Sequence, residues 1–140
     1  MILTKTEIAA KQIDTAIDLF LTDKDFISAL TIAGAGEEIL GTLLKRSGKK
    51  NMLTKLHKYH ENISGIDYKT FCRNENYARN ALKHATDPDE DEIEIGKGET
   101  IFMIMRCMFN YEELTGETTD KMIEMAKWLR IKNNLEALWK

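Results

Sequence analysis

Apolar residues recur every three or four positions along most of this 140-residue chain, and a single proline, Pro88, interrupts the pattern. This spacing places apolar side chains on one face of an α-helix, whereas a proline inside a helix breaks it. Hydrophobic residues make up 43% of the chain and charged residues 31%. That is enough apolar material for the core of one domain. The sequence therefore predicts an all-α fold, an up-and-down bundle of five to six helices in one domain spanning residues 1–140.

Capping residues and helix-ending residues divide this pattern into separate helices. Thr4 and Glu7 form a capping box at the first helix, Asn51 can cap the third, and Pro88 should end the fourth near Ala85 or Thr86. The predicted helices cover residues 4–21, 26–46, 51–63, 67–85, 100–115 and 119–129, with Ser47-Gly48 ending the second, and a tail with Leu135, Leu138 and Trp139 that docks on the bundle follows the last.

Two helices have unusual faces. Gly34, Gly36 and Gly41 lie inside the second helix, where each costs about 1 kcal/mol relative to alanine. Close approach of another helix to this small-residue face is the expected compensation. The run 101–109 is apolar nearly all round, so its helix should be buried on two sides or face a partner subunit.

Charge is unevenly distributed along the chain. The net charge is -3 overall, but residues 1–44 carry -4, residues 45–84 carry +7 and residues 85–140 carry -6. A local positive field of this kind steers polyanions even when the whole protein is acidic. It favours a limited contact with RNA over wrapping of duplex DNA.

The predicted fourth helix has one apolar and one basic side. Projected at 100° per residue, Phe71, Ala78 and Leu82 share the core side. The opposite arc contains cations and amides but no acid: Lys69, Arg73, Asn76, Arg79, Asn80, Lys83 and His84. Such an arc suits phosphate, although a solvated helix face has the same composition. His84 should lie in the last turn, where the helix dipole favours the charged imidazole.

Arg79-Asn80, three further residues and His84 resemble the signature of the HEPN family (higher eukaryotes and prokaryotes nucleotide-binding), and the Ala33–Gly41 segment resembles that of its small prokaryotic members. The resemblance implies a metal-independent endoribonuclease, in a defence or stress role, in which the ribose 2′-hydroxyl attacks the adjacent phosphate. Imidazole moves the proton and guanidinium neutralises the phosphorane charge. Arg79, Asn80 and His84 would be catalytic, and Lys69, Arg73, Asn76 and Lys83 would bind RNA or nucleotide.

The family commonly joins two copies of the motif across a dimer cleft, so the resemblance also implies a homodimer. One subgroup, the toxins paired with nucleotidyltransferase antitoxins, has a tyrosine two residues after the histidine. This chain has Thr86 there, so neither a toxin role nor regulation through that tyrosine is implied. A second interpretation from the same residues is a non-catalytic module that binds nucleotide or RNA, or that only dimerises.

Other chemistries find little support. No Ser-His-Asp, Cys-His, dinucleotide or phosphate-loop pattern occurs, and no cofactor or metal is expected, because no Cys or carboxylate is spaced to join His57, His60 and His84 in a zinc site. Cys72 and Cys107 are expected to be buried free thiols. Without a signal-peptide core or an apolar run of membrane-spanning length, a cytoplasmic protein that does not associate with membranes is expected. The acidic stretch 87–99 is either a solvated loop or a lid over the basic arc.

Overall fold

The computed structural model describes residues 1–138, with side chains up to Arg130, and this part of the chain is all helical with no strand. The all-α prediction is therefore confirmed. There are seven helices in residues 1–138: α1 (Lys5–Leu21), α2 (Phe26–Arg46), α3 (Met52–Ser64), α4 (Tyr68–Glu75), α5 (Tyr77–Ala81), α6 (Lys97–Thr115) and α7 (Asp120–Leu138).

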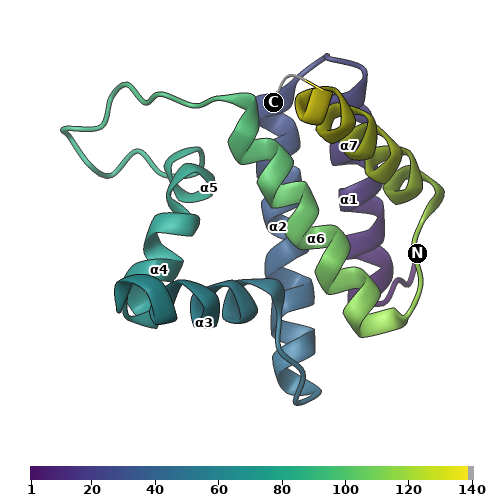
Figure 1. Cartoon of the computed structure of the whole chain (residues 1–140), viewed down its shortest axis with the longest axis horizontal. Coiled ribbons are helices and arrows are strands. Elements are labelled where there is room, and N and C mark those ends of the chain that lie inside the picture. Colours follow the sequence, from purple (N-terminus) through teal and green to yellow (C-terminus); the bar gives the residue numbers. More distant parts are fainter. Residues whose placement is uncertain (139–140) are drawn as a thin grey trace.

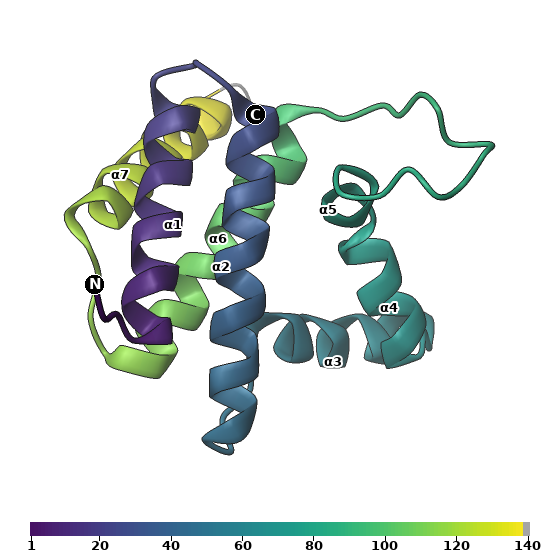
Figure 2. The ribbon, with the colours of Figure 1, turned by 180° about the vertical axis from the view of Figure 1, so that it is seen from behind.

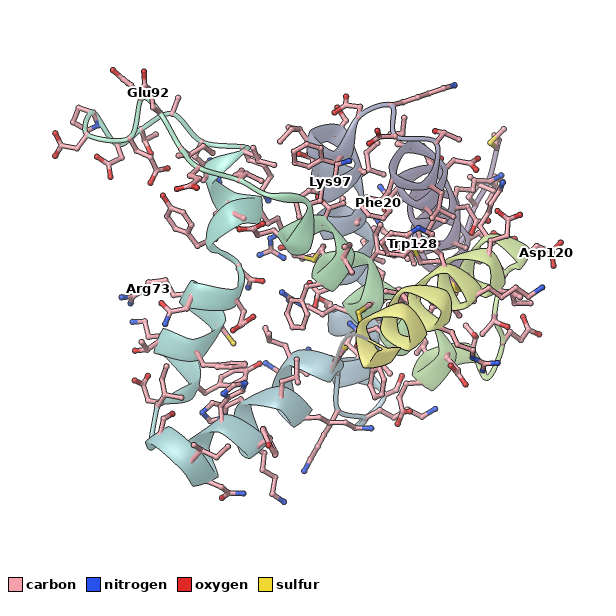
Figure 3. All side chains as sticks on the ribbon, turned by 45° about the horizontal axis from the view of Figure 1, so that its top comes forward. Phe20, Arg73, Glu92, Lys97, Asp120 and Trp128 are labelled. Carbon is pink, nitrogen blue, oxygen red and sulfur yellow. The ribbon has the colours of Figure 1, made fainter. Side chains whose placement is uncertain are left out.

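Helices α1, α2 and α6 pack against one another, and α7 lies along α1 on the outside of this bundle (Figure 1). The apolar positions predicted for α1 form its buried face: Ala9, Ile13, Ala16, Ile17 and Phe20. Phe20 also contacts Trp128 of α7 edge-on, with 5.2 Å between ring centroids, and the two lie side by side in Figure 3. The predicted tail is part of α7 up to Leu138, while the docking of its three apolar side chains lies outside the described side chains.

Side-chain caps start the helices where the sequence predicted them. Thr4 and Glu7 form the capping box of α1, and Asn51 accepts a hydrogen bond from the Thr54 backbone at the start of α3. Asp67 caps α4 by accepting hydrogen bonds from Thr70, which hold the pKa of its carboxyl below the usual range. Among the predicted helix starts one differs, because α6 begins at Lys97 and not at residue 100.

Helices α3, α4 and α5 form an arm on one side of the bundle, as Figures 1 and 2 show. Helix α3 runs away from the C-terminal end of α2, α4 turns upward from it, and the loop 82–96 leads outward before the chain returns to α6 (Figure 2). The arm contacts the bundle through α3 against α6 and α5 against α2. The basic residues 45–84 therefore occupy one side of the molecule.

The prediction of one continuous helix over residues 67–85 is wrong. The helix is interrupted at Asn76, whose ψ of 2° departs from the helical value, and α5 ends at Ala81. The last turn tightens through a bond from the Lys83 amide to the Asn80 carbonyl, so the helix ends well before Pro88. His84 consequently lies outside the helix. The prediction that His84 lies in the last helical turn, under the influence of the helix dipole, is therefore wrong.

The central helix α2 ends at Arg46 with Ser47 as its C-cap, as predicted, but it is more apolar than expected. By length and composition it could cross a membrane, contrary to the expectation that no apolar run reaches that length. Half of its most apolar window is buried inside the bundle, and core helices commonly meet the same criterion. Gly36 of α2 faces α1, where a Cβ atom would lie 3.3 Å from the Ile13 side chain. Close packing against this small-residue face is therefore confirmed.

The two thiols, both free as expected, should differ in reactivity. Cys107 is fully buried and donates to the Ala33 carbonyl at 3.0 Å, and its burial raises the pKa of the thiol. Cys72 is only partly buried, so the expectation that both thiols are buried is wrong for this residue. We expect Ellman's reagent at mildly alkaline pH to modify one thiol in the native protein and two after denaturation. Cys72→Ser should remove the native reaction, and equal reactivity of both thiols would contradict this packing.

Candidate functional site

Arg79 points into the protein, although the helical projection placed it on the outer arc. Its side chain is only 11% exposed. Ala78 and Leu82, which the projection placed on the core side, do pack against the core, and Phe71 of α4 faces inward as predicted. Among the cations of the predicted arc it is Arg79, directly after Ala78, that turns toward α2.

Glu37 of α2 receives this arginine in a buried ionic cluster. Its carboxylate, 5% exposed, accepts a hydrogen bond from Arg79 Nη1 at 3.4 Å. On the other oxygen, Arg106 Nη2 of α6 lies at 2.9 Å in an ion pair without hydrogen-bond geometry. Arg106 is fully buried and donates through Nη1 to the carbonyl of Glu75, the last residue of α4. The cluster therefore joins α2, α4, α5 and α6.

Gly34 gives the Arg79 side chain room to reach Glu37. A Cβ atom at this position would lie 2.6 Å from both Cγ and Cδ of Arg79, closer than such atoms can approach. The glycine lies one helical turn before Glu37, on the same face of α2. The expected close approach to Gly34 is therefore present, but the approaching group is an arginine side chain and not a helix backbone.

The cluster has more positive than negative charge. Two buried guanidinium groups share one buried carboxylate, and the second nearby carboxylate, Glu38, is exposed and lies 4.0 Å from Arg79 Nη1. The Nε atoms of both arginines are buried without a hydrogen-bond partner. Buried donors of this kind favour an anionic acceptor where one can reach them.

Arg79 lies between two open cavities. One, of about 230 Å³, is lined by Arg79, Arg106, Asn76, Tyr68 and Lys45, and we call it the Arg106 cavity. The other, of about 410 Å³, is lined by Arg79 together with Phe102, Glu75 and Glu99. Arg79 therefore borders two open cavities, and both also have carboxylates in their lining.

The other residues predicted for the site lie on the surface. Lys69, Arg73, Asn80, Lys83 and His84 are exposed, and Figure 3 shows Arg73 projecting away from α4. Asn76 is partly buried and its Oδ1 atom has no hydrogen-bond partner.

No hydrogen bond in the described structure joins His84 to Arg79, and His84 lines neither cavity beside the arginine. The structure thus places the two signature residues on one short segment without bringing their side chains together within one chain.

The acidic loop is attached to α5 next to Arg79. Tyr77 donates a hydrogen bond to Glu90 at 2.8 Å, and this bond raises the pKa of the Tyr77 hydroxyl. Beyond this attachment the loop projects into solvent, with Glu92 at its far end (Figure 3). Of the two interpretations of the acidic stretch, the solvated loop describes its tip, while Glu90 is held to α5 through Tyr77.

Sequence reasoning missed Glu37 and Arg106 as part of the site. Arg106 had a usable signal, since it is the one charged residue in the otherwise apolar run 101–109, and arginine is almost never fully buried without a partner. Glu37 had none beyond its position one turn after Gly34.

The described residues contain no group of three His, Cys, Asp or Glu side chains that could hold a metal ion. His57, one of the three histidines considered for such a site, instead packs against Phe71 and Tyr68. Its Nε2 lies 2.8 Å from the Ile66 carbonyl.

The buried cluster can be tested by removing the Glu37 charge. In Glu37→Gln, two buried guanidinium groups lose their counter-charge, and breaking a buried pair in this way costs about 3–5 kcal/mol. We expect urea unfolding to show a loss of that order. Glu38→Gln, on the neighbouring exposed carboxylate, is the matched control and should change stability by less than about 0.5 kcal/mol. Equal stabilities of the two variants would show that the cluster does not hold the arm to the bundle.

Comparisons with known proteins leave the resemblance to HEPN proteins as a prediction from the residues. No family model, no curated protein and no solved structure matches this chain.

Proposed function

We propose that this chain is a metal-independent endoribonuclease of the HEPN type that acts in the cytoplasm as a homodimer. The observation that supports this most is the buried cluster with excess positive charge, which holds Arg79 between two open cavities, five residues before an exposed imidazole. A fixed guanidinium group suits stabilisation of a phosphorane, because its donors are already oriented when charge develops.

In the proposed reaction the 2′-hydroxyl of one nucleotide attacks the adjacent phosphorus. The new P–O2′ bond forms as the P–O5′ bond breaks, which leaves a 2′,3′-cyclic phosphate and a free 5′-hydroxyl. His84 of one copy accepts the proton of the attacking hydroxyl, and His84 of the second copy donates a proton to the departing 5′-oxygen. Arg79 stabilises the charge on the non-bridging oxygens, and Asn80 can hydrogen-bond the same phosphate.

The exposed position of His84 supports the dimeric form of the site. Within one chain nothing holds the imidazole near Arg79, whereas a second copy can provide both a wall for the cavities and a second imidazole. Lys69, Arg73 and Lys83 are exposed on the same arm and would contact neighbouring phosphates, with Asn76 beside the Arg106 cavity.

One observation favours the non-catalytic module as a second candidate. Arg79 already has a carboxylate partner in Glu37, and a structural arginine would look the same. Binding of nucleotide or RNA needs only the positive charge of the arm, while cleavage also needs His84. The histidine therefore distinguishes the two functions.

Dimerisation is the first expected outcome. Helix α6 is mostly apolar and keeps Met105 37% exposed, and two-fold dimers are the commonest assembly among soluble homo-oligomers. We expect multi-angle light scattering at micromolar concentration to give twice the 16.1 kDa chain mass. A monomer mass under these conditions would rule out the site composed of two copies.

Cleavage should depend on His84. We expect His84→Ala to lower the rate by roughly 100-fold to 10,000-fold, the usual effect of removing a general acid or base. The rate should be measured on total cellular RNA in excess chelator, where the parent protein should remain active and leave cyclic phosphate ends.

Thr86→Ala is the matched control, because Thr86 is exposed on the same segment and has no role in the reaction. It should cleave at the parent rate. Equal cleavage by the parent and His84→Ala proteins, or none by either, would favour the non-catalytic module.

A further inference from the structure

The most basic segment of the chain lies outside the signature. Between residues 39 and 60 there are six lysines and arginines and no acid. These residues form the end of α2, the turn after it and α3, at the foot of the arm in Figure 2. Lys69, Arg73 and Lys83, which the sequence analysis assigned to RNA binding, are on α4 and beyond α5 instead.

Most of these cations have no counter-charge. Lys45, Arg46, Lys50 and Lys58 are exposed and make no ion pair in the described part of the chain. Lys55 is the exception, with its Nζ 3.3 Å from Glu113. Unpaired lysines clustered in this way attract a polyanion, and their counterions are released when it binds.

The surface over this segment is hollowed into a groove that leads to Arg79. A cavity of about 420 Å³ is lined by Lys45, Lys50 and Tyr68, and a second of about 700 Å³ is lined by Lys50, Lys58 and Tyr59, with Glu61 as the one acid in the two linings. The first also shares Lys45 and Tyr68 with the Arg106 cavity. The three depressions are therefore neighbours. The Arg106 cavity comes first, the cavity lined by Tyr68 comes next, and the cavity lined by Tyr59 comes last. We call them together the α3 groove.

An aromatic ring stands at the far end of this groove. Tyr59 is 65% exposed, and its ring meets only the edge of His60, at 5.8 Å between centroids, among the ring contacts of the described residues. An exposed tyrosine among lysines is typical of surfaces that bind single strands, where a base stacks on the ring and the lysines follow the phosphates. A duplex hides its base faces and cannot use such a ring.

From the groove, its unpaired lysines and the exposed Tyr59 we propose that the α3 groove binds single-stranded RNA and leads it to Arg79. A base stacks on Tyr59, and Lys58, Lys50 and Lys45 contact successive phosphates on the way to the Arg106 cavity. This inference rests on the proposed function, because the strand in the groove is the one that Arg79 and His84 would cleave. It adds that the substrate is unpaired on that side of the cleavage point.

Binding can be measured separately from cleavage. A fluorescein-labelled 2′-O-methyl oligouridine of about 12 nucleotides has no 2′-hydroxyl nucleophile and would cover a site of this kind. We expect fluorescence anisotropy to show that the triple variant K45Q/K50Q/K58Q binds it at least about tenfold more weakly. The slope of log K against log salt concentration should fall by about two, the value for three lost phosphate contacts on a single strand. Tyr59→Leu should weaken binding about fivefold to a hundredfold without changing the salt dependence.

The matched control removes the same charge from another face. K5Q/K11Q/K24Q replaces three exposed lysines on and after α1, and it should bind within about twofold of the parent protein. Circular dichroism of each variant confirms that the helices are intact. Loss of cleavage in His84→Ala together with normal binding would agree with both the proposed cleavage and the proposed groove, because the oligomer measures binding in the groove alone.

Four results would overturn the proposal. The first is equal binding by the two triple variants, and the second is binding of duplex RNA as tight as that of the single strand. The third is weaker binding of the oligomer only when Lys69, Arg73 and Lys83 are all replaced by alanine. The fourth is displacement of the oligomer by polyglutamate at an equal concentration of charges together with normal binding by Tyr59→Leu, which would indicate an acidic peptide as the occupant.

Discussion

A single buried carboxylate between two guanidinium groups connects the arm of this protein to its bundle. Glu37 lies on the central helix, Arg106 on the last helix of the three-helix core, and Arg79 on the short helix that ends the arm. Apolar side chains of similar volume often stabilise a core as well as a buried ion pair does. Ionic contacts, however, require particular atoms to meet. We infer that the cluster fixes where the arm sits more than it adds to the stability of the whole protein.

The sequence was sufficient to predict the bundle but not the direction of the arm. Helix starts at Thr4 and Asn51 follow from local hydrogen bonds, and the buried face of α1 follows from its apolar spacing, so both could be recognised from neighbouring residues. The interruption at Asn76 accompanies a hydrogen bond from Arg106 to the Glu75 carbonyl, thirty-one residues away in sequence. A contact of this range leaves no periodic trace, and neither does the pairing of Arg79 with Glu37, forty-two residues away, which draws the arginine inward.

The arrangement of charge in space follows its arrangement along the chain. The basic third folds into consecutive helices that stay together as one arm, while the acidic thirds form much of the bundle and the loop after α5. An acidic protein can thus present a positive surface on one side only. The acidic loop is nevertheless tied to that side through Tyr77 and Glu90, so an anion near Arg79 would also meet negative charge at its margin.

The brevity of α5 has a consequence for how its motif becomes ordered. A helix of five residues is far below the length that is stable alone in water, so its conformation depends on attachment to something else. Arg79 provides that attachment by passing over Gly34 to Glu37. Folding of the motif and docking of the arginine are therefore one cooperative event. Whatever draws the guanidinium away from the carboxylate also loosens the segment that carries His84.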